Sequence, residues 1–300
     1  MLLKLVVGAA VPAVVGFVLI LLLVPRGSSS GDRPTRHVAW ALPVTLFAVF
    51  TVLQPWIAGK FVLVPRSASE WALPVAAFGL VFALANAAMS APGLVRVGIR
   101  FVLLVGIGTL IARTFLERWT AVESAAWLGA FAALTSMAGR GLSRIAVTQR
   151  GVDGVGVLAL FTMAAAAVCE PGLLSLPAAQ YVGIVAWLLC GAALASLWRP
   201  SLRLHHASAS MPVLIAMSVV FASALTTGDT PLWMKTALGV LLPTIPGLAW
   251  SFDRVWPAHP DGPTVKRSIA RLAIAAIPLV VIVALGGWQA LQAQANTYEY

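Results

Sequence analysis

Charge is what this chain of 300 residues most lacks. Asp, Glu, Lys and Arg make up 10% of it, and hydrophobic residues make up 60%. A typical soluble domain has about 25% charged residues. No soluble core needs so much apolar surface, and no water-soluble domain of useful size remains outside the long apolar stretches. The composition therefore excludes a soluble protein and indicates a chain that lies in a lipid bilayer.

The residue patterns of enzymes and metal sites are also missing. The chain has 2 cysteines, in successive apolar segments, and 4 histidines, all in predicted polar links. It has no HExxH, GxSxG or P-loop motif. It also has no carboxylate in the middle of an apolar segment, where ion-coupled carriers usually bury one. We therefore expect no enzymatic activity, no cofactor, no metal and no strong coupling to protons or sodium.

What the sequence has instead is a series of apolar stretches of about 20 residues, each long enough to cross a bilayer as a helix. The first is longer than the core of a usual signal peptide, so we expect it to be a span. The predicted spans are 2–24, 38–59, 71–91, 95–116, 121–139, 154–171, 176–197, 208–227, 231–252 and 268–288. They predict an all-α fold, a polytopic transmembrane helical bundle of about ten spans that forms a single membrane domain over residues 1–300.

The charges divide unevenly between the two ends of these spans. If all ten cross, most of the 20 Lys and Arg residues fall on one side, which then carries the whole net charge of +10. Positive residues favour the cytoplasmic face, so we predict a multi-pass protein of the inner (cytoplasmic) membrane with both termini outside. We expect membrane lipids as partners. We expect no nucleic acid, because no basic patch lies in a domain able to fold in water.

The ninth predicted span contains the feature that points most directly to function. Pro243-Thr244-Ile245-Pro246-Gly247 lies just past its middle. Each proline removes a backbone donor and clashes with the preceding turn, so we expect the helix to kink or break there. In lipid, carbonyls bared by a break must be satisfied by protein or by a water-filled cavity. The break is therefore either part of a binding site or a kink that its neighbours pack.

Ten spans divide into two halves, 1–150 and 151–300, which are inverted relative to each other because each holds an odd number of spans. The fourth span, with Gly106, Gly108 and Thr109 near its centre, then corresponds to the ninth. Carriers built from inverted repeats bind substrate where such spans break at the midplane. In span count and break placement the arrangement resembles bile-acid-transporter-type and auxin-efflux-carrier-type proteins, which implies that the fourth and ninth spans cross. The alternative is that Gly and Pro, common in membrane helices, only serve packing.

Polar residues at membrane depth are few. They are Asn86, Thr109, Thr135, Ser136, Thr162, Ser218 and Thr244. Asn86 is the most costly to leave unpaired, and it either bonds to another helix or contacts a ligand. Lys235, one turn inside the outer end of the ninth span, either snorkels to the interface or binds an anion.

Two functions are compatible with these features. The first is a permease for a weakly charged or amphipathic solute. Its predicted substrate-binding residues are Gly106, Gly108, Thr109, Pro243, Thr244, Pro246, Gly247, Asn86 and Lys235. The second is a non-catalytic structural or anchoring subunit of a larger membrane complex, because short links, scarce buried polarity and strips of small residues suit contact with other membrane subunits. A water-accessible cavity lined by Thr109 and Thr244 would favour the permease.

Overall fold

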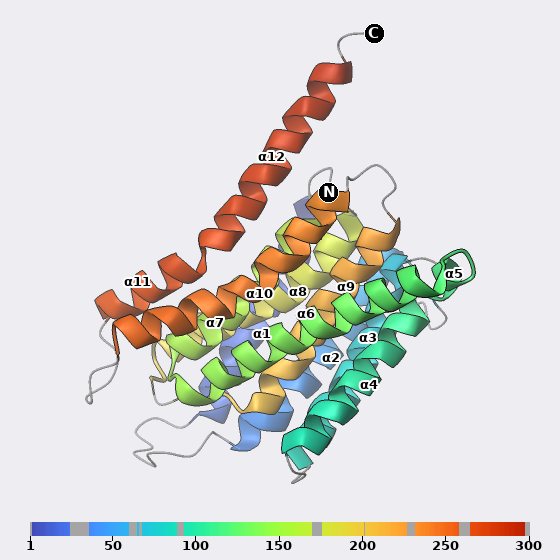
Figure 1. Ribbon diagram of the computed structural model, residues 1–300. Helices are drawn as coiled ribbons and strands as arrows, with labels where there is room; N and C mark the ends of the chain where they lie inside the picture. The colour runs from blue at the N-terminus through green and yellow to red at the C-terminus, as the bar shows by residue number, and fades with distance from the viewer. Residues whose placement is uncertain are drawn as a thin grey trace.

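The computed structural model describes residues 2–24, 36–59, 65, 68–88, 93–169, 176–200, 202–226, 232–257 and 265–297, and every regular element in these ranges is a helix (Figure 1). The first half contains α1 (Leu2–Leu23), α2 (Arg36–Ala58), the 3-10 turn η1 (Ala68–Trp71), α3 (Ala72–Ala88), α4 (Gly93–Ile111), α5 (Arg113–Leu116) and α6 (Ala121–Thr148). The second half contains α7 (Val152–Cys169), α8 (Leu176–Ser196), α9 (His206–Thr226), α10 (Leu232–Val255), α11 (Val265–Ala275) and α12 (Ile277–Thr297).

The helices coincide with the predicted spans. Eight of the first nine spans fall on one long helix each, the fourth falls on α4 and the short α5, and the tenth falls on the pair α11 and α12. The segments long and apolar enough to cross a membrane are Ala121–Thr148, Val152–Cys169, Ala178–Ser196, Ser208–Thr226 and Val265–Gln289, and shorter apolar segments lie in α1 to α4. The predicted all-α membrane bundle is confirmed.

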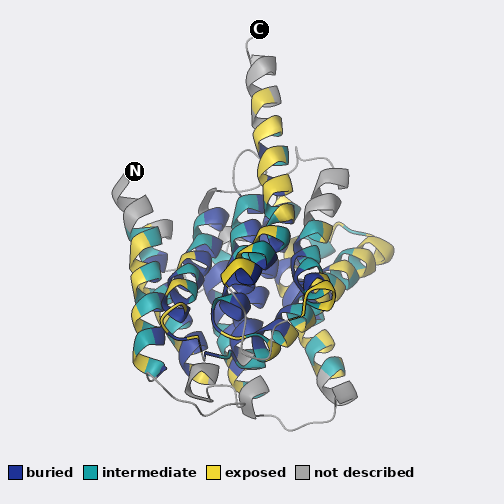
Figure 2. Cartoon of the chain, turned by 90° about the vertical axis from the view of Figure 1, so that its left-hand side faces the viewer, coloured by how far each residue is buried: buried dark blue, intermediate teal, exposed yellow. Residues whose placement is uncertain are grey.

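The centre of the bundle is formed by α7, α8 and α9. Every residue of α9 from Ser208 to Ser223 is buried, and most of α7 and α8 is buried as well (Figure 2). These helices are apolar on all sides, as expected of helices that other helices surround. Lipid tails are as apolar as the side chains, so close packing, rather than escape from water, holds such helices together.

Two glycines bring α1 and α8 to backbone contact. A Cβ on Gly16 would overlap the carbonyl group of Leu188, and a Cβ on Gly191 would overlap the carbonyl group of Ala13. Helices can approach this closely only where no side chain lies between them. The strip of small residues in the seventh span therefore serves packing inside the bundle, where Ala192 and Ala195 are also buried.

Arg199, which follows α8, secures the far end of the same contact. Its Nε donates to the carbonyl of Val24 (2.6 Å) and its Nη2 to the carbonyl of Leu21 (3.4 Å). The last carbonyls of a helix have no partner within the helix and carry a partial negative charge. The Arg199 guanidinium donates hydrogen bonds to these carbonyls and offsets their partial negative charge, so Arg199 acts as a C-terminal cap on α1.

The path of α10 corrects one prediction. The helix runs from Leu232 to Val255 without interruption through Pro243 and Pro246, so of the predicted kink or break in the ninth span the structure excludes the break. Each proline removes only one donor from the hydrogen-bond ladder. Neighbouring helices α6 and α7 pack on α10 here, and this packing keeps the helix continuous. Leu242, Ile245 and Ala249 are fully buried.

A break is present instead in the tenth span. Pro278 occupies the first turn of α12, where its missing N–H is not needed. Pro278 is itself buried, whereas the flanking Ile277 and Val280 are 52% and 65% exposed. Ile282, one turn further along, is fully buried, and the second half of α12 projects beyond the other helices (Figure 1). The start of α1 and the end of α12 point to the same end of the molecule, as an even number of crossings requires (Figures 1 and 2).

Candidate functional site

The structure does not bring the predicted site residues of the fourth and ninth spans together. Helices α4 and α10 both pack on α6, which lies between them (Figure 1). The crossing of these two spans, which the resemblance to inverted-repeat carriers implies, is therefore not found in the described part of the chain. The physical reason is that α6, a helix of 28 residues, fills the space where the crossing would occur.

The predicted residues of α4 serve its own backbone and its packing. Gly106 is exposed, with open space where a side chain would be. Gly108 is buried against α6, where a Cβ would lie 3.0 Å from both Leu128 and Phe131. The hydroxyl of Thr109 donates to the carbonyl of Val105 (2.9 Å), the usual arrangement for a threonine in a membrane helix.

The predicted residues of α10 have similar roles. Pro246 is buried over Gly141 of α6, where a Cβ on the glycine would lie 2.8 Å from the proline ring. Gly247 is exposed and Pro243 is half-buried. The hydroxyl of Thr244 donates to the carbonyl of Leu241 (2.5 Å). The side chains of Asn86 and Lys235 lie outside the described residues.

A pocket opens elsewhere, between α3, α4, α6 and α9. Its lining residues are Phe82, Val97, Arg100, Leu104, Thr135, Ser136, Gly139, Arg140, Ser143, Ser210, Val213 and Leu214. The cavity volume is about 40 Å³, room for roughly three ordered waters or one group the size of a phosphate. Arg140 is exposed whereas Thr135, halfway along α6, is 4% exposed. The pocket therefore runs from the end of the bundle near Arg140 to the middle of α6.

The deepest polar group of the pocket is incompletely satisfied. The Thr135 hydroxyl has no hydrogen-bond partner among the described residues, although most helical threonines at membrane depth bond to their own backbone. Nearer the mouth, the Ser143 hydroxyl reaches the carbonyl of His206 at 3.5 Å, a long contact. A buried unpaired hydroxyl costs free energy, so a water or a ligand atom at this position would stabilise the fold.

Aromatic side chains pack between α6 and α9 beyond Thr135. Phe131, one turn from Thr135 on α6, stacks on Phe221 of α9 with ring centroids 4.6 Å apart. Trp127 lies next to Phe221 (6.4 Å), and Trp119 stacks on Trp127 (6.1 Å). This aromatic column fills the space between α6 and α9 toward the start of α6. Gly108, one of the predicted site residues, packs on Phe131 at its base.

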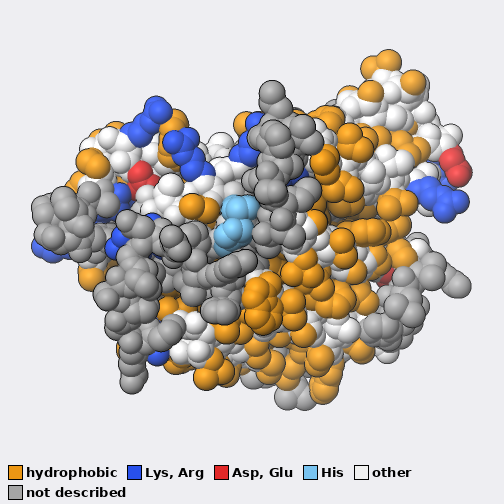
Figure 3. Space-filling model, turned by 90° about the horizontal axis from the view of Figure 1, so that it is seen from below, with side chains coloured by type: hydrophobic (Ala, Val, Ile, Leu, Met, Phe, Trp, Pro, Cys, Tyr) orange, Lys and Arg blue, Asp and Glu red, His pale blue; other side chains and the backbone are white. Residues whose placement is uncertain are grey.

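The pocket opens toward the basic end of the bundle, which we define by Arg140, Arg144, Arg150, Arg199, Arg203, Arg254, Lys266, Arg267 and Arg271. Charged side chains lie toward the two ends of the face shown in Figure 3, and many hydrophobic side chains lie between them. This distribution suits a bundle whose middle lies in hydrocarbon and whose ends reach the headgroups.

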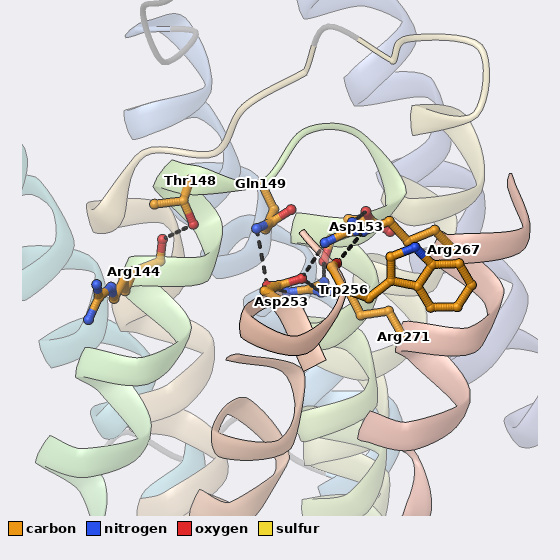
Figure 4. Close-up of polar contacts among 8 residues, drawn as sticks. All are labelled: Arg144, Thr148, Gln149, Asp153, Asp253, Trp256, Arg267 and Arg271. Atoms are coloured by element: carbon orange, nitrogen blue, oxygen red, sulfur yellow. Dashed lines mark hydrogen bonds and ion pairs between the residues drawn. The ribbon is translucent and has the colours of Figure 1, made fainter. Parts of the chain in front are cut away.

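A buried ion-pair cluster lies at the same end, between α7, α10 and α11 (Figure 4). The Arg271 guanidinium bonds to both carboxylate oxygens of Asp253 (2.9 and 3.0 Å) and to the carbonyl of Asp153 (2.6 Å). Arg267 bonds to Asp253 (2.7 Å) and to Asp153 (3.3 Å). Gln149 donates to the second oxygen of Asp253 (3.1 Å). Two cations and two anions neutralise each other, so the cluster fastens α11 to the bundle.

Two histidines lie near the pocket mouth, where the link from α8 enters α9. The ring centroids of His205 and His206 are 3.7 Å apart. Burial, and to a smaller extent the charge of His206, lower the pKa of His205 to about 4. His205 is therefore neutral at pH 7 and adds no positive charge to the basic end.

Comparison with protein-family models and with curated protein sequences finds no match for this chain. Sequence reasoning noted Thr135 and Ser136 as polar residues at depth but did not join them to Arg140, one turn further along α6. It also missed the ion-pair cluster, although Arg271 lies inside a predicted span, where a charge usually marks a buried partner.

Proposed function

We propose that this chain is a permease-like membrane protein for an amphipathic solute, with its binding site in the pocket between α3, α4, α6 and α9. The observation that carries the proposal is the unpaired, buried hydroxyl of Thr135 at the closed end of a pocket whose mouth is polar. The site differs from the predicted one at the fourth and ninth spans, but the class of solute is the same.

The shape of the pocket supports transport over static binding. The exposed Arg140 belongs to the lining at one end, and the stacked Phe131–Phe221 pair lies about one turn beyond Thr135 at the other. Carriers that work by alternating access expose a central site to one side of the membrane at a time. A pocket that reaches the middle of the bundle and stops at stacked rings suits one such state. Separation of α6 from α9 at these rings would open the other side.

The lining also supports an amphipathic solute. Val97, Leu104, Val213 and Leu214 form an apolar wall, and the hydroxyls and arginines form a polar one. A ligand with an apolar part and a polar part can contact both walls. A wholly polar solute would place its own hydration shell against the apolar wall.

Flux from proteoliposomes tests this proposal. The solutes are octyl phosphate, octyl glucoside and octyl trimethylammonium, each below its micellar concentration. With these three, transport is detected whether the protein prefers an anionic, a neutral or a cationic headgroup. Starting from Cys190→Ser, Ser136→Cys places a thiol in the pocket, and a benzyl thiosulfonate attached after folding fills it. We expect flux of at least one solute, and at least tenfold less after modification.

The matched control is Met137→Cys, the next residue on α6, whose side chain is 62% exposed on the outer face of the bundle. Modification there should leave flux unchanged. Flux no greater than in protein-free vesicles for all three solutes, or equal inhibition at both positions, would refute the permease.

A second candidate function, a non-catalytic subunit of a membrane complex, is favoured by α12. This helix projects from the bundle with apolar side chains exposed, among them Val280, Val283 and Leu291 at 65%, 56% and 67%. Such a face suits another membrane helix as well as lipid. Purification of the full chain in a mild detergent tests it, with Val283→Lys as the variant. A stoichiometric membrane partner that the wild type retains and the variant loses would support the subunit.

A further inference from the structure

We propose that the basic end of the bundle binds the headgroup of an anionic phospholipid at a site formed by Arg144 of α6 and by Trp250 and Arg254 of α10. The site is separate from the pocket, because none of these three residues belongs to the pocket lining. The inference therefore goes beyond the proposed permease and does not depend on it. It is carried by two arginines from different helices that share one aromatic ring.

The indole of Trp250 contacts both guanidinium groups. The Arg254 guanidinium carbon, one turn further along α10, lies 3.7 Å from the ring centroid, and that of Arg144 lies 5.5 Å from it. The two carbons are therefore no more than about 9 Å apart, the sum of these distances, and their positive charges repel each other. Cation–π attraction to the shared ring holds the two side chains together despite this repulsion.

No carboxylate of the described residues neutralises this pair. Neither Arg144 nor Arg254 has an ion-pair partner in that part of the chain. Asp253 is next to Arg254 in the sequence, but both of its oxygens accept hydrogen bonds within the ion-pair cluster. In Figure 4 the Arg144 side chain extends away from that cluster. An anion bound between the two arginines would therefore offset a charge that the described residues leave uncompensated.

Both guanidinium groups can still donate hydrogen bonds to such an anion. A guanidinium that lies over an aromatic ring uses its face for that contact, and its five N–H donors point outward in its own plane. Arg144 and Arg254 are exposed, and neither side chain donates to a described residue. A planar fork of donors matches the oxygens of a phosphate, so the two forks around Trp250 suit one phosphate group.

The place of these residues in the sequence indicates a lipid as the source of the phosphate. Arg144 follows the predicted span 121–139, and Trp250 and Arg254 lie at the end of the predicted span 231–252. Tryptophan is typical of the membrane interface, and arginines beyond the ends of spans favour the cytoplasmic side. The anionic lipids of the cytoplasmic leaflet attract such residues.

An apolar stripe leads from the site toward the middle of the bundle. Gly247, Pro243 and Val240 precede Trp250 on α10 by three, seven and ten residues, a spacing that places them on one face of the helix. Gly247 is exposed, with open space where a side chain would be, and Val240 is 51% exposed. The hydrocarbon chains of a lipid can lie along this stripe while the arginines hold its head, whereas a free phosphate would leave the stripe unused.

Native mass spectrometry of the full chain, delipidated and released from detergent micelles, tests the inference by titration. The probes are dioleoyl phosphatidylglycerol, dioleoyl phosphatidylcholine and glycerophosphoglycerol, which has the anionic head without the tails. The choline head brings a positive charge toward the arginines, and the glycerol head does not. We expect the phosphatidylglycerol to bind at least tenfold more tightly than each of the other two probes.

Three variants assign the effect to the site. Arg144→Gln and Arg254→Gln should each weaken phosphatidylglycerol binding at least fivefold and leave phosphatidylcholine binding unchanged. Lys266→Gln is the matched control, because Lys266 is exposed at the same end of the bundle but lies on α11. It removes the same charge and should weaken binding less than twofold. Both arginines are exposed, so their replacement is not expected to prevent folding.

Each alternative has its own outcome. Equal affinity for the two lipids, or equal losses in Lys266→Gln and the arginine variants, would overturn the site and leave only a general attraction of the basic end to anionic lipid. Glycerophosphoglycerol bound as tightly as phosphatidylglycerol would overturn the lipid and identify a soluble anion. A dimer that forms in place of the lipid complex, and that Arg254→Gln abolishes, would identify a second copy of the chain as the occupant and overturn the proposal.

The result is independent of the permease proposal. The benzyl group attached at Ser136→Cys fills the pocket and does not reach α10, so phosphatidylglycerol should bind that protein as it binds the wild type. Arginine-dependent binding without flux would support this inference and refute the permease. Flux without any preference for phosphatidylglycerol would do the reverse.

Discussion

Gly191 is the residue at which α8 touches the backbone of α1, and a single methyl group there has no room. We expect Gly191→Ala to destabilise the bundle by about 3 kcal/mol or more, because the added Cβ meets a carbonyl that cannot move without its helix. Thermal unfolding of the purified protein in detergent would measure the loss as a lower Tm.

Gly183, two turns earlier on the same helix, provides the control. Nothing lies within 4 Å of where its Cβ would be, so Gly183→Ala should leave Tm unchanged or raise it slightly, since alanine favours helix. A Gly191→Ala protein as stable as Gly183→Ala would show that α1 and α8 are not in backbone contact.

His205 should make stability depend on pH. Its pKa is lowered in the folded state to about 4 by burial and by His206, against about 6.5 when unfolded. The unfolded chain therefore binds a proton first as the pH falls, and stability should be lost between pH 6.5 and 4. We expect Tm to fall over this range in the wild type and to fall less in His205→Gln. A steeper fall in the variant would contradict the assignment.

Single residues also show where local sequence patterns stop being informative. Thr109 and Thr135 both interrupt apolar segments, and nothing next to them distinguishes their roles. In the fold Thr109 bonds one turn back, whereas Thr135 faces the pocket. The difference depends on which residues of α3 and α9 stand opposite, and these are distant in the sequence.

At the scale of elements, α11 depends on its ion pairs. Its face toward the bundle is polar, with Arg267, Ser268 and Arg271 all buried, so apolar packing cannot hold it alone. Asp253 accepts from both arginines. We expect Asp253→Asn to cost about 3–5 kcal/mol, because it leaves buried guanidinium charge unpaired, and to increase proteolysis between α10 and α11.

Glu117→Gln is the control for that change, because Glu117 is exposed at the far end of the bundle, and it should be neutral within about 0.5 kcal/mol. Adding Arg271→Met to Asp253→Asn should restore part of the stability, since it removes one unpaired charge. If the double variant were less stable than Asp253→Asn alone, unpaired charge would not be the cause.

The prolines show why helix breaks were harder to predict than helices. Pro243 and Pro246 predict a kink or a break in the ninth span, and α10 has no break, while Pro278 stands at the junction of α11 and α12. Each of the three prolines lacks the backbone N–H that would donate a hydrogen bond in a helix. Packing by α6 and α7 decides the outcome for α10, and that packing is not visible in the sequence of the helix itself.

At the scale of the whole molecule, the distribution of charge predicts orientation. Lys266 is exposed at the basic end, and Glu117 is exposed at the opposite end. In a Cys190→Ser background, Lys266→Cys should react with an impermeant maleimide only from the cytoplasm and Glu117→Cys only from outside. The reverse pattern would refute the predicted topology, and reaction of both from one side would refute the ten crossings.

The helices and their order follow from hydropathy, because the bilayer requires every span to be a helix of a certain length. The bundle's internal arrangement does not follow, because membrane helices associate through shape, as at Gly16 and Gly191, rather than through a pattern of polar and apolar faces. For the same reason the pocket, built from four separate helices, could not be assembled from the sequence.

The projecting helix α12 has a consequence for the membrane around the protein. With 21 residues it is about 32 Å long, close to the thickness of the hydrocarbon layer, and its second half projects beyond the other helices. A helix in that situation adjusts its tilt to the bilayer. The angle between α12 and the bundle should therefore vary with acyl-chain length, closing as the bilayer thickens and opening as it thins.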